Sequence, residues 1–143
     1  MKAESRRQKA AIGFTLTEAM VVVIILGVLV AVGIPSYTRT IERNYRQHAE
    51  DVLMSVYYGE RSRFHTQNAY FGPPLNAASP MAEWRKIQMD NPNLGSVSVS
   101  FSVAAAGSAF TATATRTSGT CSGRTRTMDQ TRTLGGDWPT CAP

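Results

Sequence analysis

The stretch from Gly13 to Pro35, G-FTLTEAMVVVIILGVLVAVGI-P, decides how this chain is organised. Phe14 to Ile34 is a run of 21 residues in which Glu18 is the only charged side chain. At about 1.5 Å per residue, a helix of this length spans about 30 Å, the thickness of the hydrocarbon core of a bilayer. A buried strand is much shorter than this run, so its length predicts a membrane helix.

Positively charged residues precede the apolar run, and such a segment is retained on the cytoplasmic side of a membrane. These residues are Lys2, Arg6, Arg7 and Lys9, against Glu4 alone. A secretory signal peptide has the same outline, and a poor cleavage candidate lies at Ala31-Val32-Gly33. Glu18 favours a retained helix, because a carboxylate near the centre of a membrane helix costs about 2.5–3.5 kcal/mol and a discarded signal gains nothing from it.

The basic character of the chain belongs largely to its first 13 residues. The whole chain has 15 lysines and arginines against 10 aspartates and glutamates, a net charge of +5. Residues 14–143 keep 11 basic and 9 acidic residues, a net charge of +2. The charge therefore does not indicate a nucleic-acid-binding protein, and the length suits one domain plus an anchor.

Pro35 interrupts the helical pattern but need not end it. Proline removes one backbone hydrogen bond and kinks a helix, and Gly27 and Gly33 loosen the same region. Beyond the proline, one face is charged and the other is apolar at Tyr37, Ile41, Tyr45, Val52 and Val56. This spacing predicts an amphipathic helix that continues to about Phe64 and packs on another layer.

Turn-forming residues dominate 65–94, which predicts a loop with one short helix after Ser79-Pro80. Phe71 and Trp84 are expected to anchor this loop on the core. Residues 95–128 then alternate between apolar and polar residues, which predicts a β-hairpin around a link that contains Gly107. The expected inward residues are Val97, Val99, Phe101, Val103, Phe110, Ala112 and Ala114.

A third, more polar run at Cys121–Thr127 predicts a later strand near the sheet edge, where Arg124 and Arg126 would oppose edge-to-edge pairing. The elements together predict an α+β fold, in which a long N-terminal helix packs on a small antiparallel sheet.

The C-terminal tail has little apolar periodicity and needs another constraint. Cys121 and Cys141 enclose 19 residues, and a disulfide closing such a loop is worth about 3 kcal/mol. A disulfide suits two cysteines in an exported domain, whereas free or metal-bound thiols are the alternatives. The chain has no CxxC motif, and no histidine lies near either cysteine.

No arrangement of residues indicates catalysis, a cofactor or a metal site. His48 and His65 are 17 positions apart and lack a third ligand at a metal-binding spacing. Gly135-Gly136 lacks the lysine and the following helix of a phosphate-binding loop. We therefore expect a protein that is not an enzyme.

The basic leader, Gly13, the pentapeptide FTLTE that starts at Phe14, the apolar run and Pro35 resemble the class III signal of type IV pilins. The resemblance implies that a prepilin peptidase cleaves between Gly13 and Phe14 and methylates the new N-terminus at Phe14. Glu18 becomes the fifth mature residue and Pro35 the twenty-second, as in the family. Thr17 departs from the leucine or isoleucine that the family more often has at that position.

The resemblance implies the pilin "lollipop" fold with three segments: a cleaved leader (1–13), a transmembrane and filament-core helix (14–35) and a periplasmic or extracellular globular domain (36–143). Within the globular domain it implies an amphipathic helix to about 64, an αβ-loop (65–94), a sheet (95–128) and a C-terminal region (121–141). In pilins, a disulfide commonly closes that last region, here between Cys121 and Cys141.

The resemblance also assigns a role to Glu18, whose carboxylate would pair with the N-terminal amine of a neighbouring subunit. A buried pair of this kind is effective at fixing the register of packed helices. The alternative is that Glu18 only extends toward the lipid headgroups from near the helix end.

The implied partners are other pilin subunits, the prepilin peptidase, an inner-membrane assembly platform and, before assembly, membrane lipid; no cofactor is implied. The implied location is the bacterial inner membrane, as a single-pass protein, and then the extracellular pilus. The segments RFHTQNAYF and GTCSGRTRTMDQTRTLGG resemble PilE-like minor pilins, few copies of which prime the filament.

A major pilin, a type II secretion pseudopilin and a DNA-receptor pilin are the alternatives. For the last of these, a basic stripe on the exposed sheet edge would meet phosphates. Its residues would be Arg116, Arg124, Arg126 and Arg132. Arginines that only keep an edge soluble are the plainer interpretation of the same four residues.

Overall fold

The computed structural model describes residues 13–95 and 98–141 of the chain. They belong to two compact units, a first that ends at Ser36 and a second that begins at Tyr37. One helix, α1 (Leu16–Gln67), contributes its N-terminal part to the first unit and its C-terminal part to the second. Pro35 lies inside α1, which confirms the predicted continuation past the proline, and the helix ends three residues beyond Phe64.

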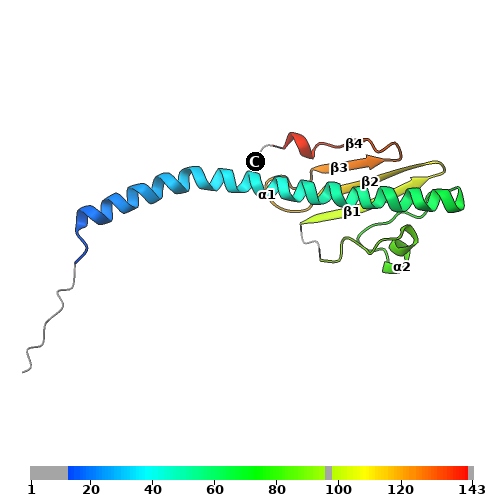
Figure 1. Cartoon of the computed structure of the whole chain (residues 1–143), viewed down its shortest axis with the longest axis horizontal. Coiled ribbons are helices and arrows are strands. Elements are labelled where there is room, and N and C mark those ends of the chain that lie inside the picture. The colour runs from blue at the N-terminus through cyan, green and yellow to red at the C-terminus, as the bar shows by residue number, and fades with distance from the viewer. Residues whose placement is uncertain (1–12, 96–97, 142–143) are drawn as a thin grey trace, which may run out of the picture. The chain divides into compact units, whose positions relative to one another are not determined.

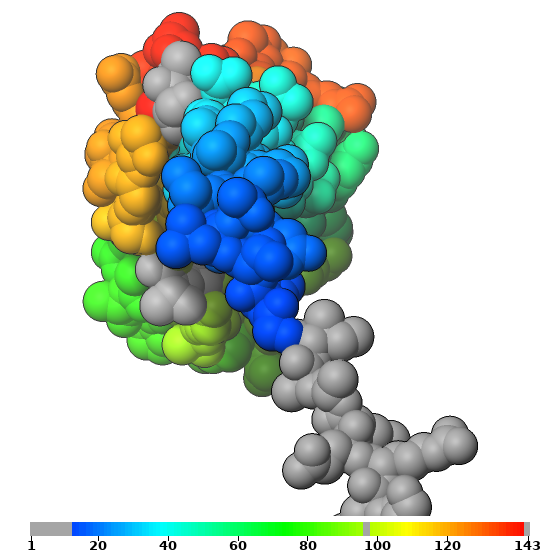
Figure 2. Space-filling model, turned by 90° about the vertical axis from the view of Figure 1, so that its left-hand side faces the viewer, coloured from blue at the N-terminus to red at the C-terminus, as the bar shows by residue number. Residues whose placement is uncertain are grey.

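The first unit contains the apolar part of α1, and its side chains are uncovered. The large apolar residues from Phe14 to Ile34 are 44–78% exposed. Figure 2 shows this segment, in blue, with its side chains open toward the viewer. Among the described residues, α1 is the one helix that is long and apolar enough to cross a membrane. An apolar surface of this extent requires lipid or other protein chains around it.

The second unit contains a four-stranded antiparallel sheet in the order β1-β2-β3-β4 (Figure 1). Its strands are β1 (Val99–Ala106), β2 (Ala109–Arg116), β3 (Thr125–Asp129) and β4 (Leu134–Gly135). Ala106 pairs with Ala109, so β1 and β2 form the predicted hairpin, with Gly107 in its turn at a φ of 61°. Val97, expected in the first strand, lies outside the described residues.

The third strand starts later than predicted. β3 begins at Thr125 rather than at Cys121, because the chain turns at 121–124, where the Gly123 N–H donates to the Arg116 carbonyl over 2.7 Å. The strand lies near the sheet edge, as predicted, with only β4 paired outside it. The edge on this side is therefore a strand of only two residues, which presents few unpaired backbone groups.

The core of the second unit lies between α1 and one face of the sheet. On α1, Ala49, Leu53 and Val56 are buried, at the three-to-four-residue spacing expected for one helix face. The sheet contributes the inward residues that alternation predicted, all buried: Val99, Phe101, Val103, Phe110, Ala112 and Ala114. The α+β fold predicted from the sequence is confirmed.

The segment after α1 contains a short helix, α2 (Met81–Trp84), followed by the 3-10 helix η1 (Arg85–Ile87). Pro80 occupies the N-cap position of α2, so this helix follows Ser79-Pro80 as predicted. Trp84 and Phe71 are buried in the core, as expected. This segment lies against α1 at Gly59, where an added Cβ would overlap the carbonyl oxygen of Ile87.

The same segment also covers the outer edge of β1. Leu75 forms an antiparallel bridge with Val103, with hydrogen bonds of 2.8 and 2.9 Å in the two directions. The Asn93 side chain then pairs with the backbone of Phe101, accepting from its N–H over 2.7 Å and donating to its carbonyl over 3.1 Å. Backbone groups that a free edge would expose are therefore satisfied within the chain.

Candidate functional site

The start of α1 carries the predicted processing and assembly residues. Gly13 and Phe14 precede the helix and are exposed. Glu18 lies in its first turn and closes a capping box with Thr15: its carboxylate accepts from the Thr15 N–H over 2.9 Å, and the Glu18 N–H donates to the Thr15 hydroxyl over 3.3 Å. Each side chain satisfies a backbone donor that the helix leaves free.

The capping box was missed in the sequence, although the Thr-x-x-Glu spacing of Thr15 and Glu18 is its signature. Glu18 therefore has a local function in starting the helix, beside the assembly role expected from the resemblance. Gly27 and Gly33, expected to loosen the helix near Pro35, lie in open space, with nothing within 4 Å of an added Cβ. Neither glycine is required by a close contact in the first unit.

Arg116 is buried in the second unit and joins β2 to α1. Its guanidinium donates two hydrogen bonds to Glu42, of 3.1 Å to Oε2 and 3.0 Å to Oε1. It also donates to the Ser98 carbonyl over 2.8 Å and lies 3.9 Å from the centre of the Tyr45 ring. Both charged side chains are nearly inaccessible to solvent, so the charge of each is compensated by the charge of the other.

The structure contradicts the predicted basic stripe of Arg116, Arg124, Arg126 and Arg132 at Arg116, which is buried, whereas Arg124 and Arg132 are exposed. Arg116 is 3% exposed and points into the joint with α1. Arg124, directly before β3, and Arg126, in β3, also have carboxylate partners. Arg124 pairs with Asp137 at 2.9 Å, and Arg126 pairs with Glu50 at 2.8 Å.

Arg132 lies apart from these residues, in the turn after β3 with a φ of 63°. Sequence alternation placed the four arginines on an edge, but β4 occupies that edge and acidic residues neutralise three of them.

Asp137 connects the C-terminal segment to the start of β3. Its carboxylate accepts from the Thr125 N–H over 2.7 Å and from Arg124 over 2.9 Å. These bonds, the Thr125 backbone bond first, favour the charged form and lower the pKa of Asp137 to about 2. The segment that follows is further fixed by the disulfide between Cys121 and Cys141, which confirms that expectation over free thiols.

Glu60 is a buried carboxylate on the core face of α1. One oxygen accepts from the Phe71 N–H over 2.9 Å, while Oε1 has no hydrogen-bond partner among the described residues. Burial raises the pKa of Glu60, because it penalises the charged form more than the Phe71 bond and the charge of Arg63 favour it. Glu60 follows Val56 by four residues, so the helical spacing places it on the buried face, a signal that the sequence analysis did not use.

His48 and His65 lie on α1, and no group of three potential metal ligands occurs among the described residues. The edge of the His48 ring faces Phe101, with 6.2 Å between the ring centres, so this histidine packs on the core.

Comparison with known proteins gives one partial similarity. The chain is similar to the type IV major pilin protein PilA of Myxococcus xanthus (strain DK1622), with 36% identity over 58 residues. The matched region is 41% of this chain and 26% of the relative, so the chain covers about a quarter of the relative's length. No protein-family model and no solved structure matches.

Proposed function

We propose that this chain is a structural subunit of a type IV pilus, held in the membrane by residues 14–35 before it joins the filament. The observation that carries the proposal is the uncovered apolar part of α1, which has no partner layer in its own unit. The partial similarity to a major pilin and the α+β arrangement of the second unit support it. Parallel packing of such helices from several copies would supply the missing cover.

The proposal includes removal of residues 1–13 and methylation of Phe14 by a prepilin peptidase. Gly13 and Phe14 precede the first residue of α1 and are exposed, so the bond between them is open to a peptidase. Intact mass and N-terminal mapping of the protein from membranes test this step. The expected chain begins with methylated Phe14 and is two mass units lighter than the dithiol form. A chain that begins at Ile34 would instead identify a secreted domain without an anchor.

Glu18 is proposed to pair with the N-terminal amine of a neighbouring copy, which fixes the stagger between helices. We expect Glu18→Ala to be inserted into the membrane but to enter filaments about tenfold less than the wild type, a difference of about 1.4 kcal/mol. Quantification of the subunit in sheared filaments and in membranes measures this ratio.

The capping box requires a control, because Glu18→Ala also removes a helix cap. Thr15→Val breaks the side-chain half of the box and keeps the carboxylate. If Thr15→Val reduces incorporation as much as Glu18→Ala, the effect comes from helix capping, and the pairing between subunits is wrong.

Within the pilus we propose a minor subunit, present in few copies, that primes or joins the filament at the inner-membrane assembly platform. The likeness of RFHTQNAYF and of the C-terminal segment to PilE-like minor pilins supports this role. A major pilin is the second candidate, favoured by the similarity to PilA. Copy number in purified filaments separates the two, since a major subunit accounts for most of the filament mass.

A further inference from the structure

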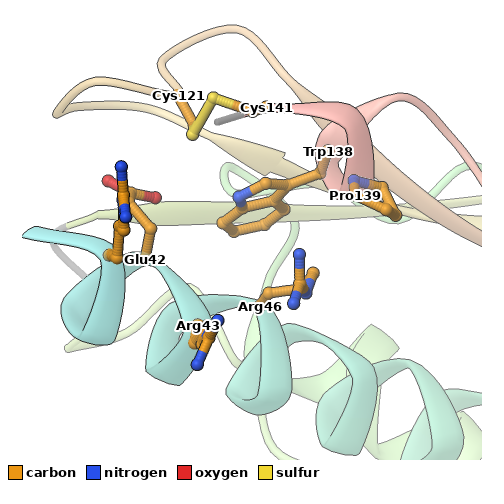
Figure 3. A pocket seen from close by; sticks show the side chains of 8 residues that line it. Glu42, Arg43, Arg46, Cys121, Trp138, Pro139 and Cys141 are labelled. Carbon is orange, nitrogen blue, oxygen red and sulfur yellow. A yellow bond between two sulfur atoms is a disulfide. The ribbon is translucent and has the colours of Figure 1, made fainter. Parts of the chain in front are cut away.

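A pocket of about 400 Å³ lies in the second unit, between α1 and the C-terminal segment closed by the disulfide (Figure 3). Its volume is within the range of about 300–1,000 Å³ that small-molecule sites have. One wall is a stretch of α1, and the other is Trp138, Pro139 and the disulfide. The α1 residues that line it are Arg39, Glu42, Arg43 and Arg46.

The charge of this pocket is positive. Three arginines line it against one acid, Glu42, and both oxygens of Glu42 are already bound by Arg116, which comes from β2 and is not a lining residue. Within residues 13–95 and 98–141, Arg43 and Arg46 have no ion-pair partner, whereas Arg85, Arg116, Arg124 and Arg126 each have one. Unlike the sheet arginines, these two are left with uncompensated charge.

The pocket also contains an unpartnered buried donor. Trp138 is 1% exposed, and its indole Nε1–H has no acceptor among the described residues. In Figure 3 the nitrogen-bearing edge of this ring faces the side where Glu42 and the disulfide lie. The other tryptophan, Trp84, donates its Nε1–H to the Asn76 carbonyl at 3.3 Å. A buried N–H without an acceptor destabilises the structure, so a hydrogen-bond acceptor that enters the pocket would be stabilised there.

We propose that this pocket binds a phosphate group, held by Arg43 and Arg46 with the Trp138 Nε1–H as a further donor. Guanidinium groups bind phosphate oxygens through paired, charge-assisted hydrogen bonds, and phosphate has enough oxygens to accept from several donors at once. The opposite wall of the pocket would contact the apolar or sugar-like group that carries the phosphate. It consists of Trp138, Pro139 and the disulfide.

Two sources supply such a group, a free phosphate compound and the headgroup of a phospholipid. Arg39 follows Pro35 by four residues, so the pocket begins directly after the segment proposed to lie in the membrane. Basic residues beside a membrane segment attract anionic lipids. The lipid source rests on the proposed function, whereas binding of free phosphate does not, so the two can fail separately.

The test follows the two indole N–H signals of the full chain, labelled with ¹⁵N-tryptophan, in uncharged maltoside micelles. One arm adds inorganic phosphate, and the other adds phosphatidylglycerol to the micelles; sodium chloride at equal ionic strength is the reference. We expect the Trp138 signal to shift saturably in at least one arm while the Trp84 signal stays in place. Saturation by inorganic phosphate identifies a free-phosphate site, and saturation by phosphatidylglycerol alone identifies a lipid site.

The variant Arg43→Gln/Arg46→Gln should weaken this binding about tenfold or more, because it removes the charged donors. Its matched control is Arg61→Gln, which changes an exposed arginine of the same helix outside the pocket. An unshifted Trp84 signal in each variant shows that the second unit remains folded.

Three results overturn the proposal. The first is the absence of a saturable Trp138 shift in both arms. The second is equal weakening by Arg61→Gln, which would mean attraction to the general charge of the helix. The third is a Trp138 shift that depends on protein concentration without added phosphate, because the acceptor would then be a group of another copy.

Discussion

The two parts of α1 have the same secondary structure and opposite surroundings. From Phe14 to Ile34 the large apolar side chains are exposed, whereas from Glu42 onward one face is buried; Tyr37, expected on that face, is 67% exposed. Both parts are α-helical, so secondary structure does not account for the difference. The N-terminal part obtains its stability from lipid or from other chains, and the C-terminal part obtains it from the core of its own unit.

Charged residues follow the same division. Glu18 bonds only to Thr15, three positions away, so its contacts in the first unit are local. Glu42 and Glu50, in the second unit, pair with Arg116 and Arg126, which lie 74 and 76 positions further along the chain. Among the described residues, the polar bonds of Glu18 therefore stay within the first turn of α1, whereas two ion pairs fix the C-terminal part of α1 to the sheet.

The largest effect is expected from Arg116→Met, which leaves Glu42 buried without compensation. Breaking one partner of a buried pair costs about 3–5 kcal/mol, a large share of the stability of a small domain. Denaturant unfolding followed by tryptophan fluorescence measures it, because Trp84 and Trp138 both lie in the second unit. Insertion of the first unit into membranes should be unchanged.

The double variant Glu42→Leu/Arg116→Met is the control for this effect. It removes both charges and keeps apolar volume at the joint, so it should regain most of the stability that the single variant loses. If the double variant is as unstable as Arg116→Met, the lost stability comes from the other Arg116 bonds, such as the one to Ser98. The ion pair between Glu42 and Arg116 would then contribute little to the free energy of unfolding.

The next effect is expected from Cys121→Ser/Cys141→Ser. Loss of a cross-link over a loop of this length costs about 3 kcal/mol, chiefly by freeing the unfolded chain. The unfolding midpoint of the variant should equal that of the wild type in reductant, which is the matched control. A variant with an unchanged midpoint would mean that Asp137 and Trp138 hold the C-terminal segment without the disulfide.

A smaller effect is expected from an alanine in place of Gly59. The added Cβ would overlap the Ile87 carbonyl and push η1 away from α1, at a cost of about 1–3 kcal/mol. Gly27→Ala is the matched change in the other part of the same helix, where the Cβ meets nothing. It should leave the fluorescence-detected unfolding unchanged and raise helix propensity by about 1 kcal/mol. Equal losses in the two variants would remove the contrast between the parts of α1.

The smallest effect is a pH dependence. Because burial raises the pKa of Glu60, the folded state holds its proton above pH 4.5, where the unfolded state has released it, and stability falls as pH rises through the folded pKa. Asp137 acts oppositely, since its lowered pKa removes stability only as pH falls from 3.8 toward about 2. Glu60→Gln should flatten the decline above pH 4.5 and leave the acid side unchanged. A decline that persists in Glu60→Gln would assign it to another group.

Local signals predicted most of the fold. The apolar run, the helical spacing beyond Pro35 and the alternation in β1 and β2 each need only neighbouring residues to be read. β4 was not predicted, because two residues carry no periodicity and its place depends on pairing with β3. The start of β3 was misplaced for a similar reason, since the turn at 121–124 is fixed by bonds to Arg116.

The site was predicted less completely than the fold, because its decisive contacts are distant in sequence. From the sequence, Glu42 and Arg116 both look like surface residues. They come into contact only because α1 packs on the sheet. The pocket proposed to bind phosphate likewise combines one face of α1 with Trp138, near the other end of the chain. Capping of α1 by Thr15 was readable in the sequence and was overlooked.

The covered edge of β1 has a consequence for a chain that is proposed to polymerise. A sheet with an open edge offers a second way to grow, by adding strands from other copies into a fibre that cannot be taken apart. The Leu75 bridge and the Asn93 side chain already occupy the pairing groups that such growth would use. In the proposed filament, the apolar helix is then the surface through which subunits associate, and a lipid bilayer can receive that surface again when the polymer is dismantled.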